Sequence, residues 1–433
     1  MAEFTFRYGD GKMNFNYPEE DIIGIIEPGQ CDIPQISEKE KIIQAIENPV
    51  GMPRLEEVIK PGESVCMIVP DITRQWGRPA QIIEELVLKL EKIGVKDEDI
   101  LILCGTGTHR KQTPEEHALI VSQGVYDRIK VEDHDCDNNL VKVGTSFRGN
   151  DFWVNATAMK YDHRMIVGAT VFHFLAGFGA GRKYVLPGIS GRSTIMSNHS
   201  MYFAPGGIGS GTNPEVALGK YDNNPVSREM YEVADLIGIT MNVTGVIGPD
   251  KKLAFCFAGE LHESHRLATE KCRELDGVAV DAYADCVIAC GMGYPKDINL
   301  YQTTSKTISN STGVIKKSKD SVQIIVAECR DGIGNEDTVK LLTEMDNAID
   351  RENYTRENYT VGLNIAYMLT QTAEEHHLIV VSDIDPEIFK KSKIHGVHTI
   401  EEAIELARKL TGKEHMSTYL MPYAANTCAY VSE

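Results

Sequence analysis

Residues 64–109 read SVCMIVPDITRQWGRPAQIIEELVLKLEKIGVKDEDILILCGTGTH, with two short apolar runs on either side of an amphipathic segment. The runs at 64–71 and 99–109 are typical of buried strands, and the segment 82–94 has helical spacing and ends at a glycine. This order predicts a βαβ unit with parallel strands. Polar residues follow both strands, in DITRQ from 71 and GTGTHR from 105. Because ligands of open α/β sheets bind beyond the carboxyl ends of the strands, we expect a site there.

The same alternation of short apolar runs and amphipathic segments continues along the chain. A third strand is predicted at 164–173, a hairpin at 242–260 and a connecting helix at 261–275, and further strands at 284–291, 321–329 and 377–383. We therefore predict an α/β fold of two α/β domains with mostly parallel sheets and an active-site cleft between the domains. The expected domains are 1–270 and 271–433, with the last residues packing back on the first domain.

Composition excludes several classes of protein. The chain has 433 residues, 42% of them hydrophobic and 25% charged, which is typical of a folded globular protein. The 63 acidic residues exceed the 44 basic ones, so the net charge of -19 disfavours nucleic acid as a partner. The sequence lacks a signal-like start and an apolar run of membrane-spanning length, which predicts a cytoplasmic protein without membrane contact. Its ten cysteines lack metal-ligand spacing and are expected to be reduced structural thiols.

A glycine-rich segment, VFHFLAGFGAGRKYVLPGISG, occupies residues 171–191. A phosphate-binding P-loop is disfavoured because Arg182 precedes Lys183 and Tyr184 follows it. The glycines alternate as G-x-G-x-G, which does not match a dinucleotide-binding fingerprint. Small residues let the backbone approach a bulky ligand, and Lys183 is then either a covalent anchor or Schiff-base former, or an ordinary solvated lysine.

Three of the 13 histidines stand out by their position. His109, His173 and His199 each follow a predicted strand or lie in the glycine-rich region, where imidazole suits proton transfer or binding of a transition metal. We expect the histidines at 262, 265, 376, 377, 395 and 398 to be solvated. The acidic run at 132–137 is expected to form a solvated or capping turn.

Arg74 and Asp71 follow the first strand of the predicted βαβ unit. An arginine there can bind a carboxylate or phosphate with two hydrogen bonds, and the aspartate can accept from hydroxyls. The alternative is a strand cap with a surface ion pair.

Several motifs together resemble the lactate racemase family, in order along nearly the whole chain. They are DITRQ from 71, GTGTHR from 105, the glycine-rich block at 171–191, SNH from 197 and YPKDINLYQ from 294. Members of this family racemise or epimerise 2-hydroxy acids with a nickel-pincer nucleotide. This cofactor is a pyridinium mononucleotide whose carbon and two sulfur atoms bind nickel.

The resemblance implies a role for each matching residue. Lys183 would carry the cofactor covalently through its thioacyl group, and His199 would bind nickel. His109 and His173 would be the two acid/base groups during reversible hydride transfer to the cofactor. The loop Asp71, Ile72, Thr73 and Arg74 would bind the cofactor, with Arg74 also meeting the substrate carboxylate. The resemblance further implies that residues 1–270 bind the cofactor and catalyse the reaction, and that enzymes of cofactor synthesis are partners.

The expected domain 271–433 would contact the substrate through Tyr301 and Gln302, which match the family's Tyr-Gln pair. Lactate enzymes carry a lysine four residues beyond the tyrosine, where this chain has Ser305 followed by Lys306. On an α-helix that slip rotates the lysine by about 100°. The difference favours a larger or more polar 2-hydroxy acid than lactate, with Ser305 among the substrate contacts.

Two other functions remain open at this point. One is a noncatalytic protein that binds a nucleotide-like cofactor, although such a binder has no need of His109 and His173. The other is a zinc hydrolase built on the three histidines, which would leave Lys183 and the Tyr-Gln pair without a role. Arg182 either binds the nucleotide phosphate, binds a second substrate carboxylate, or faces solvent.

Overall fold

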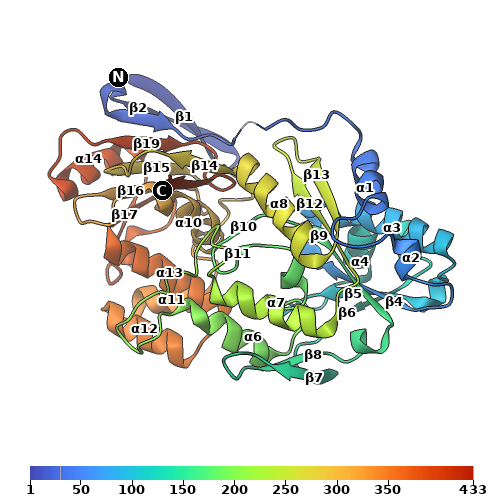
Figure 1. The fold of residues 1–433 in the computed structure, drawn as a ribbon. Helices are drawn as coiled ribbons and strands as arrows, with labels where there is room; N and C mark the ends of the chain where they lie inside the picture. Colours follow the sequence, from blue (N-terminus) through green and yellow to red (C-terminus); the bar gives the residue numbers. More distant parts are fainter. Residues whose placement is uncertain (30, 433) are drawn as a thin grey trace. The chain divides into compact units, whose positions relative to one another are not determined.

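The computed structural model describes residues 1–29 and 31–432, and the chain divides into two compact units (Figure 1). The central unit comprises Cys31–Tyr202 and Asn213–Leu275. The terminal unit comprises Met1–Gln30, Phe203–Thr212 and Asp276–Glu433, and so contains both ends of the chain. The division near residue 275 lies close to the expected boundary, whereas the first residues cluster with the second half of the chain rather than with the first.

The central unit is built on a six-stranded sheet. Its strand order is β13 (Leu253–Gly259), β12 (Met241–Ile247), β9 (His163–Ala169), β4 (Val65–Pro70), β5 (Ile100–Gly105) and β6 (Lys130–Asp133). The strands from β12 to β6 are parallel, and only β13 is antiparallel to its neighbour. The predicted strands and the predicted hairpin are confirmed, and the mixed α/β class with mostly parallel sheets is shown.

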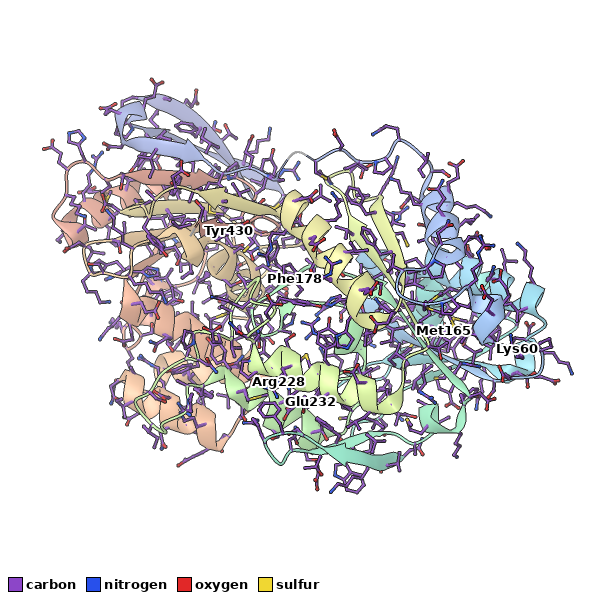
Figure 2. The ribbon with its side chains drawn as sticks, in the orientation of Figure 1. Lys60, Met165, Phe178, Arg228, Glu232 and Tyr430 are labelled. Atoms are coloured by element: carbon purple, nitrogen blue, oxygen red, sulfur yellow. The ribbon has the colours of Figure 1, made fainter. Side chains whose placement is uncertain are left out.

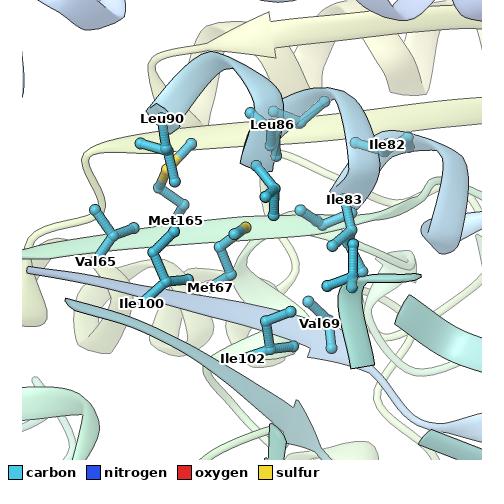
Figure 3. Close-up of a cluster of buried hydrophobic side chains, with 14 of the residues drawn as sticks. Val65, Met67, Val69, Ile82, Ile83, Leu86, Leu90, Ile100, Ile102 and Met165 are labelled. Carbon is cyan, nitrogen blue, oxygen red and sulfur yellow. The ribbon is translucent and has the colours of Figure 1, made fainter. Parts of the chain in front are cut away.

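Helices cover one face of this sheet. α1 (Glu38–Glu47) and α3 (Pro79–Ile93) contribute Ile42, Ile82 and Leu86 to a core that includes Met67 and Ile102 of the strands. Figure 3 shows α3 lying across β4 and β5, with its branched side chains directed at them. Side chains on both faces of β4 are fully buried, which explains why its sequence is a continuous apolar run without alternation.

The opposite face of the sheet carries α8 (Leu261–Asp276) and a 3-10 turn, Gly181–Tyr184. Asn242 of β12 donates to the Ser264 hydroxyl of α8 at 2.8 Å. The turn packs against β4, β9 and β12, and the Tyr184 ring lies on Gly168. A Cβ at Gly168 would stand 2.1 Å from the Cε2 atom of Tyr184, so only glycine lets the turn approach β9 this closely.

Further helices and strands complete the central unit. They are α2 (Leu55–Val58), α4 (Pro114–Val121), α5 (Gln123–Tyr126), β7 (Leu140–Thr145), β8 (Asp151–Asn155), β10 (Phe172–His173), β11 (Gly177–Phe178), α6 (Arg192–His199) and α7 (Pro225–Ile237). Phe178 of β11 and Met165 of β9 are labelled in Figure 2.

The terminal unit contains a second parallel sheet of six strands. Its order is β18 (Ile394–Val397), β17 (His377–Val381), β16 (Val322–Val326), β15 (Cys286–Cys290), β19 (Thr418–Met421) and β3 (Ile22–Ile25). The hairpin of β1 (Ala2–Tyr8) and β2 (Gly11–Tyr17) packs with α14 (Ile400–Thr411) on one face. Residues of three helices cover the other face: α9 (Leu300–Thr303), α11 (Glu336–Thr343) and α13 (Val361–Glu375). The remaining elements are α10 (Ser309–Ser311), α12 (Ala348–Glu357), β14 (Gly277–Val280) and β20 (Cys428–Val431), which pairs with β14.

Two expectations about single residues are wrong. His265 and His376 are fully buried, although both were expected to be solvated. His376 Nε2 donates to Gln323 Oε1 in the terminal core, at 3.0 Å. All ten cysteines are free thiols. In the part of the chain that the structure describes, no helix combines the length and the apolar character that a membrane crossing requires.

The contact between Gly168 and Tyr184 predicts the effect of adding one methyl group. Gly168→Ala should lower the free energy of unfolding by about 1–3 kcal/mol, because the new Cβ would overlap a buried ring. Urea denaturation followed by circular dichroism measures the change. Gly124→Ala is the matched control, since a Cβ there meets nothing within 4 Å. Equal stability of the two variants would contradict the prediction.

Candidate active site

The loop after β4 holds a buried carboxylate. Asp71 is 4% exposed, and its Oδ1 accepts from the Thr73 amide at 3.2 Å and from the Thr73 hydroxyl at 2.5 Å. Burial alone would raise the pKa of Asp71, but hydrogen bonds from His109 and Thr73 outweigh it, so the pKa is lowered from its usual value. Asp71 is therefore ionised at neutral pH. Arg74 lies exposed one residue beyond Thr73 and donates to its hydroxyl at 3.2 Å.

His109 reaches this carboxylate from the loop after β5. Its Nδ1 lies 2.5 Å from Asp71 Oδ2, and its side chain is 52% exposed. The two loops meet because β4 and β5 are parallel neighbours that end in register, with Pro70 beside Gly105. A second link joins the same loops, since the Ile72 amide donates to Gln112 Oε1 at 2.5 Å.

A polar cluster behind His109 holds Gln112 in place. Asp133 accepts from the Gln112 amide at 2.8 Å and from Gln112 Nε2 at 3.0 Å, and His117 Nε2 lies 2.9 Å from the same carboxylate. Among the described residues, the group of ligand type that lies close enough to hold a metal is Cys104, His117 and Asp133. Burial raises the pKa of the Cys104 thiol, and Asp133 is already contacted by Gln112 and His117, so the cluster supports the loop. The histidines at 109, 173 and 199 do not form such a group, which removes the geometric basis for a zinc site built on them.

His173 lies after β9, on the other side of β4. Its Nδ1 accepts from the backbone amides of Leu175 at 3.2 Å and Ala176 at 3.3 Å. The ring stacks on Phe174, with centroids 5.0 Å apart. The backbone of the glycine-rich segment therefore orients this imidazole.

Lys183 is partly buried, whereas its neighbours in the sequence, Arg182 and Tyr184, are buried. Arg182 is 0% exposed and donates to the carbonyl oxygens of Ala176 at 2.7 Å and Phe178 at 3.3 Å. Arg182 thus neither faces solvent nor extends to a ligand phosphate, and it instead holds the glycine-rich segment together. Lys183 is the member of this turn whose side chain is partly exposed.

His265 completes the surroundings of Arg182. Its Nε2 lies 2.7 Å from the Gly179 carbonyl, and its Nδ1 lies 2.8 Å from the Tyr231 hydroxyl. Burial, and then the Arg182 charge, place the pKa of His265 well below its usual value, so the ring is neutral. The Tyr231 ring lies 4.9 Å from the guanidinium carbon, in cation–π contact.

His199 ends α6 and is 5% exposed. Burial lowers its pKa to about 3, and the nearby Lys183 charge acts in the same direction. The Asn198 Oδ1 lies 3.1 Å from His199 Nδ1, and Asn198 Nδ2 is occupied by donation to Glu229, so His199 donates from Nδ1. A neutral ring protonated at Nδ1 has its lone pair on Nε2, which is the form that binds a metal ion. A neutral imidazole nitrogen of this kind has the chemistry of a ligand for a first-row transition metal.

The expected substrate-contacting residues share one helical segment of the terminal unit. Tyr301 and Gln302 lie in α9, and burial, with the Asp337 charge, raises the pKa of Tyr301. Ser305 follows in a π-helical turn, Thr304–Ile308, and donates its hydroxyl to the Gln302 carbonyl at 3.0 Å. Lys306 lies in the same turn. A π-helix has more residues in each turn than an α-helix, so Lys306 is rotated by less than the α-helical estimate.

The residues expected at the site are brought together in two pairs, Asp71 with His109 and Lys183 with His199. The sequence did not identify Gln112, Asp133 and His265 as supporting residues. Asp133 was hidden within the acidic run at 132–137, which only partly forms the expected solvated or capping turn. Asp135 accepts from the Asp137 amide and Asp137 is exposed, whereas His134 and Cys136 are buried. His265 carried a usable signal, because it shares the apolar spacing of Leu261, Ala268 and Cys272 on α8.

Comparisons with known proteins agree along the chain. Residues 8–209 match the lactate racemase N-terminal domain, and residues 279–423 match the lactate racemase C-terminal domain. A lactate racemase of Lactiplantibacillus plantarum is 30% identical over 388 residues, covering 88% of each chain. A lactate racemase of Thermoanaerobacterium thermosaccharolyticum is 29% identical over 424 residues, covering 96% of each.

One solved structure supports the same family, and a second one shares the fold. The lactate racemase apoprotein from T. thermosaccharolyticum matches with a TM-score of 0.87 at 28% identity over 100% of both chains. A protein from Thermotoga maritima shares the fold, with a TM-score of 0.61 at 17% identity over 91% of this chain and 98% of that one. This chain therefore belongs to the lactate racemase family of isomerases.

Proposed function

We propose that this chain is a racemase or epimerase of a 2-hydroxy acid that depends on a nickel-pincer nucleotide. The observation that carries the proposal is the arrangement at one edge of the central sheet. A hydrogen-bonded Asp71–His109 pair and the backbone-held His173 follow strands that flank one another, and Lys183 lies near a neutral, buried His199. A noncatalytic binder would not require either acid/base histidine.

Lys183 and His199 are the residues that would hold the cofactor. Lys183 supplies an amine for the covalent bond, and His199 supplies an imidazole nitrogen to nickel. The loop from Asp71 to Arg74 would flank the nucleotide. When bound, the cofactor supplies the acceptor for the hydride that leaves the α-carbon of the substrate.

His109 and His173 would exchange the hydroxyl proton of the substrate. The α-hydrogen of a 2-hydroxy acid is weakly acidic, so its removal as a proton is difficult. Its removal as hydride requires an acceptor for the hydride together with a base that takes the hydroxyl proton. Two imidazoles allow the proton to leave from one face and to be supplied at the other. Arg74 offers two parallel donors for the substrate carboxylate, and Tyr301, Gln302 and Ser305 are the proposed contacts from the terminal unit.

Ser305 in place of a lysine supports a substrate other than lactate. A serine side chain is shorter than a lysine side chain and adds a hydroxyl, so a larger or more polar acid has room and a hydrogen-bond partner. The proposed setting is the cytoplasm, with the enzymes of cofactor synthesis as partners that must act before this protein is active.

A panel of single-enantiomer acids tests the function directly. Cofactor-loaded protein should convert at least one short, aromatic, dicarboxylic or sugar-derived 2-hydroxy acid to a mixture of stereoisomers, measured by chiral chromatography. The same protein made without the cofactor-synthesis enzymes should be folded and inactive, because its own residues provide no hydride acceptor. Turnover by the unloaded protein would contradict the cofactor assignment.

Covalent attachment at Lys183 predicts a mass difference. In cells that make the cofactor, the wild-type chain should carry an adduct in intact-protein mass spectrometry, and Lys183→Ala and Lys183→Arg should carry none. Lys183→Arg retains a positive charge but lacks the amine that forms the bond. Lys160→Ala, which changes an exposed lysine of the same unit, should retain the adduct. An adduct on Lys183→Arg would place the attachment elsewhere.

The variants of the three histidines should differ in nickel content. His109→Ala and His173→Ala are each expected to lower kcat by roughly 10²-fold or more while nickel per chain is unchanged, since general acid–base groups contribute about that much. His199→Ala should lose nickel as well as activity. Nickel is measured by plasma mass spectrometry and activity by chiral chromatography. Loss of nickel from either of the first two variants would instead make that residue a ligand.

A further inference from the structure

The contact between His109 and Asp71 determines which ring nitrogen carries the proton. A carboxylate can only accept a hydrogen bond, so the 2.5 Å contact requires a proton on His109 Nδ1. A neutral ring protonated at Nδ1 has its lone pair on Nε2. The Nε2 atom of His109 is therefore the atom of the ring that can accept a proton.

The carboxylate itself is held rigidly. Thr73 occupies Oδ1 with both its amide and its hydroxyl, which leaves Oδ2 for His109. Asp71 stays ionised because these hydrogen bonds outweigh the effect of burial on its pKa. A buried and fixed anion of this kind both orients an imidazole and stabilises the imidazolium that forms when the ring takes up a proton.

His173 has the opposite arrangement. Two backbone amides donate to its Nδ1, so this nitrogen must present a lone pair, and the proton of the neutral ring lies on Nε2. Protonation of Nδ1 would place a third hydrogen against the amides of Leu175 and Ala176. The charged form of His173 is therefore disfavoured by the same contacts that orient the ring.

We propose that Asp71 is a positioning residue that holds His109 in the Nδ1–H tautomer, whereas the Leu175 and Ala176 amides hold His173 in the Nε2–H tautomer. The two imidazoles are thus unequal: His109 presents a proton acceptor, and His173 presents a hydrogen-bond donor. Asp71 then acts on the reaction through His109.

The consequence for catalysis rests on the proposed function. In the step that begins at His109, the O–H bond of the substrate breaks and an Nε2–H bond forms. The ring gains one positive charge, which faces the negative charge of Asp71. In the Nε2–H tautomer, His173 presents a hydrogen-bond donor at Nε2 and no proton acceptor at that atom. For the opposite step, His173 must first release the two amides or exchange its tautomer.

Nuclear magnetic resonance tests the tautomers without any activity measurement. The full-length protein, with and without cofactor, is labelled with ¹⁵N-histidine, and long-range ¹H–¹⁵N correlations report which nitrogen of each ring is protonated. His109→Gln and His173→Gln assign the two sets of signals. We expect Nδ1–H for His109 and Nε2–H for His173 in the wild-type chain. An Nε2–H signal for His109 in the wild-type chain would overturn the proposal.

Asp71→Asn tests the positioning role. An amide can donate to Nδ1, so His109 should shift toward the Nε2–H tautomer while His173 is unchanged. With a substrate from the panel, kcat per bound nickel should fall by about 10²-fold or more with little change in KM, because both oxygens of Asp71 contact Thr73 and His109 and not the substrate. Asp71→Glu, which keeps a carboxylate, should recover the Nδ1–H signal and part of kcat. An unchanged His109 tautomer in Asp71→Asn would overturn the proposal.

The terminal unit provides a matched control pair. His415 Nδ1 lies 3.0 Å from Asp21 Oδ1, and the side chains are 68% and 5% exposed, much as in the pair at His109. Asp21→Asn should alter the His415 tautomer and leave kcat within about twofold, as for a change outside the site. If no acid on the panel is racemised, the proposed function fails, while the tautomer measurement still decides the inference about Asp71.

Discussion

Parallel pairing of β4 with β5 on one side and β9 on the other constrains the whole site, because the three strands end at one edge of the central sheet. Asp71 stands at the end of the middle strand and is almost fully buried. A buried carboxylate without donors is costly, so the loops that supply Thr73 and His109 cannot separate from it without loss of stability. The Ile72–Gln112 bond adds a second link between the same two loops.

Periodicity predicted β4, α3 and β5 correctly because burial on both faces, helical spacing and a final glycine are local properties. The partners of the loop residues were not predictable in the same way. Asp71 and His109 are 38 residues apart, and no spacing rule pairs them. Arg182 and Lys183 are adjacent in sequence yet point in different directions, because successive residues of a 3-10 turn are rotated by about 120°. Sequence alone therefore located the loops but not the hydrogen bonds that organise them.

The order of the elements along the chain also did not predict that its first residues belong to the terminal unit. β3, near the start of the chain, pairs with β19 through Ile22 and Thr418, and the hairpin before it packs on the same sheet. An edge strand is short, so its sequence shows little periodicity. Its partner is the unpaired edge of a sheet whose other strands lie much later in the sequence, and local sequence does not identify that edge. The π-helical turn at Thr304–Ile308 was not predictable from the sequence either. One additional residue within a helix changes the hydrogen bonding of the helix without changing the apolar pattern around it.

The unequal environments of His109 and His173 are compatible with the proposed racemisation. Two enantiomers have the same free energy in solution, so kcat/KM must be equal for both, whatever the enzyme does to each. The site itself is made of L-residues on one sheet edge and has no mirror symmetry. One imidazole is held by a carboxylate and the other by backbone amides, so the site imposes no equality on the separate kcat and KM values of the two enantiomers, only on their ratios. A difference between the histidines is thus a natural property of such a site, and the contacts at Asp71 and in the glycine-rich segment determine which histidine is already in the tautomer that accepts a proton.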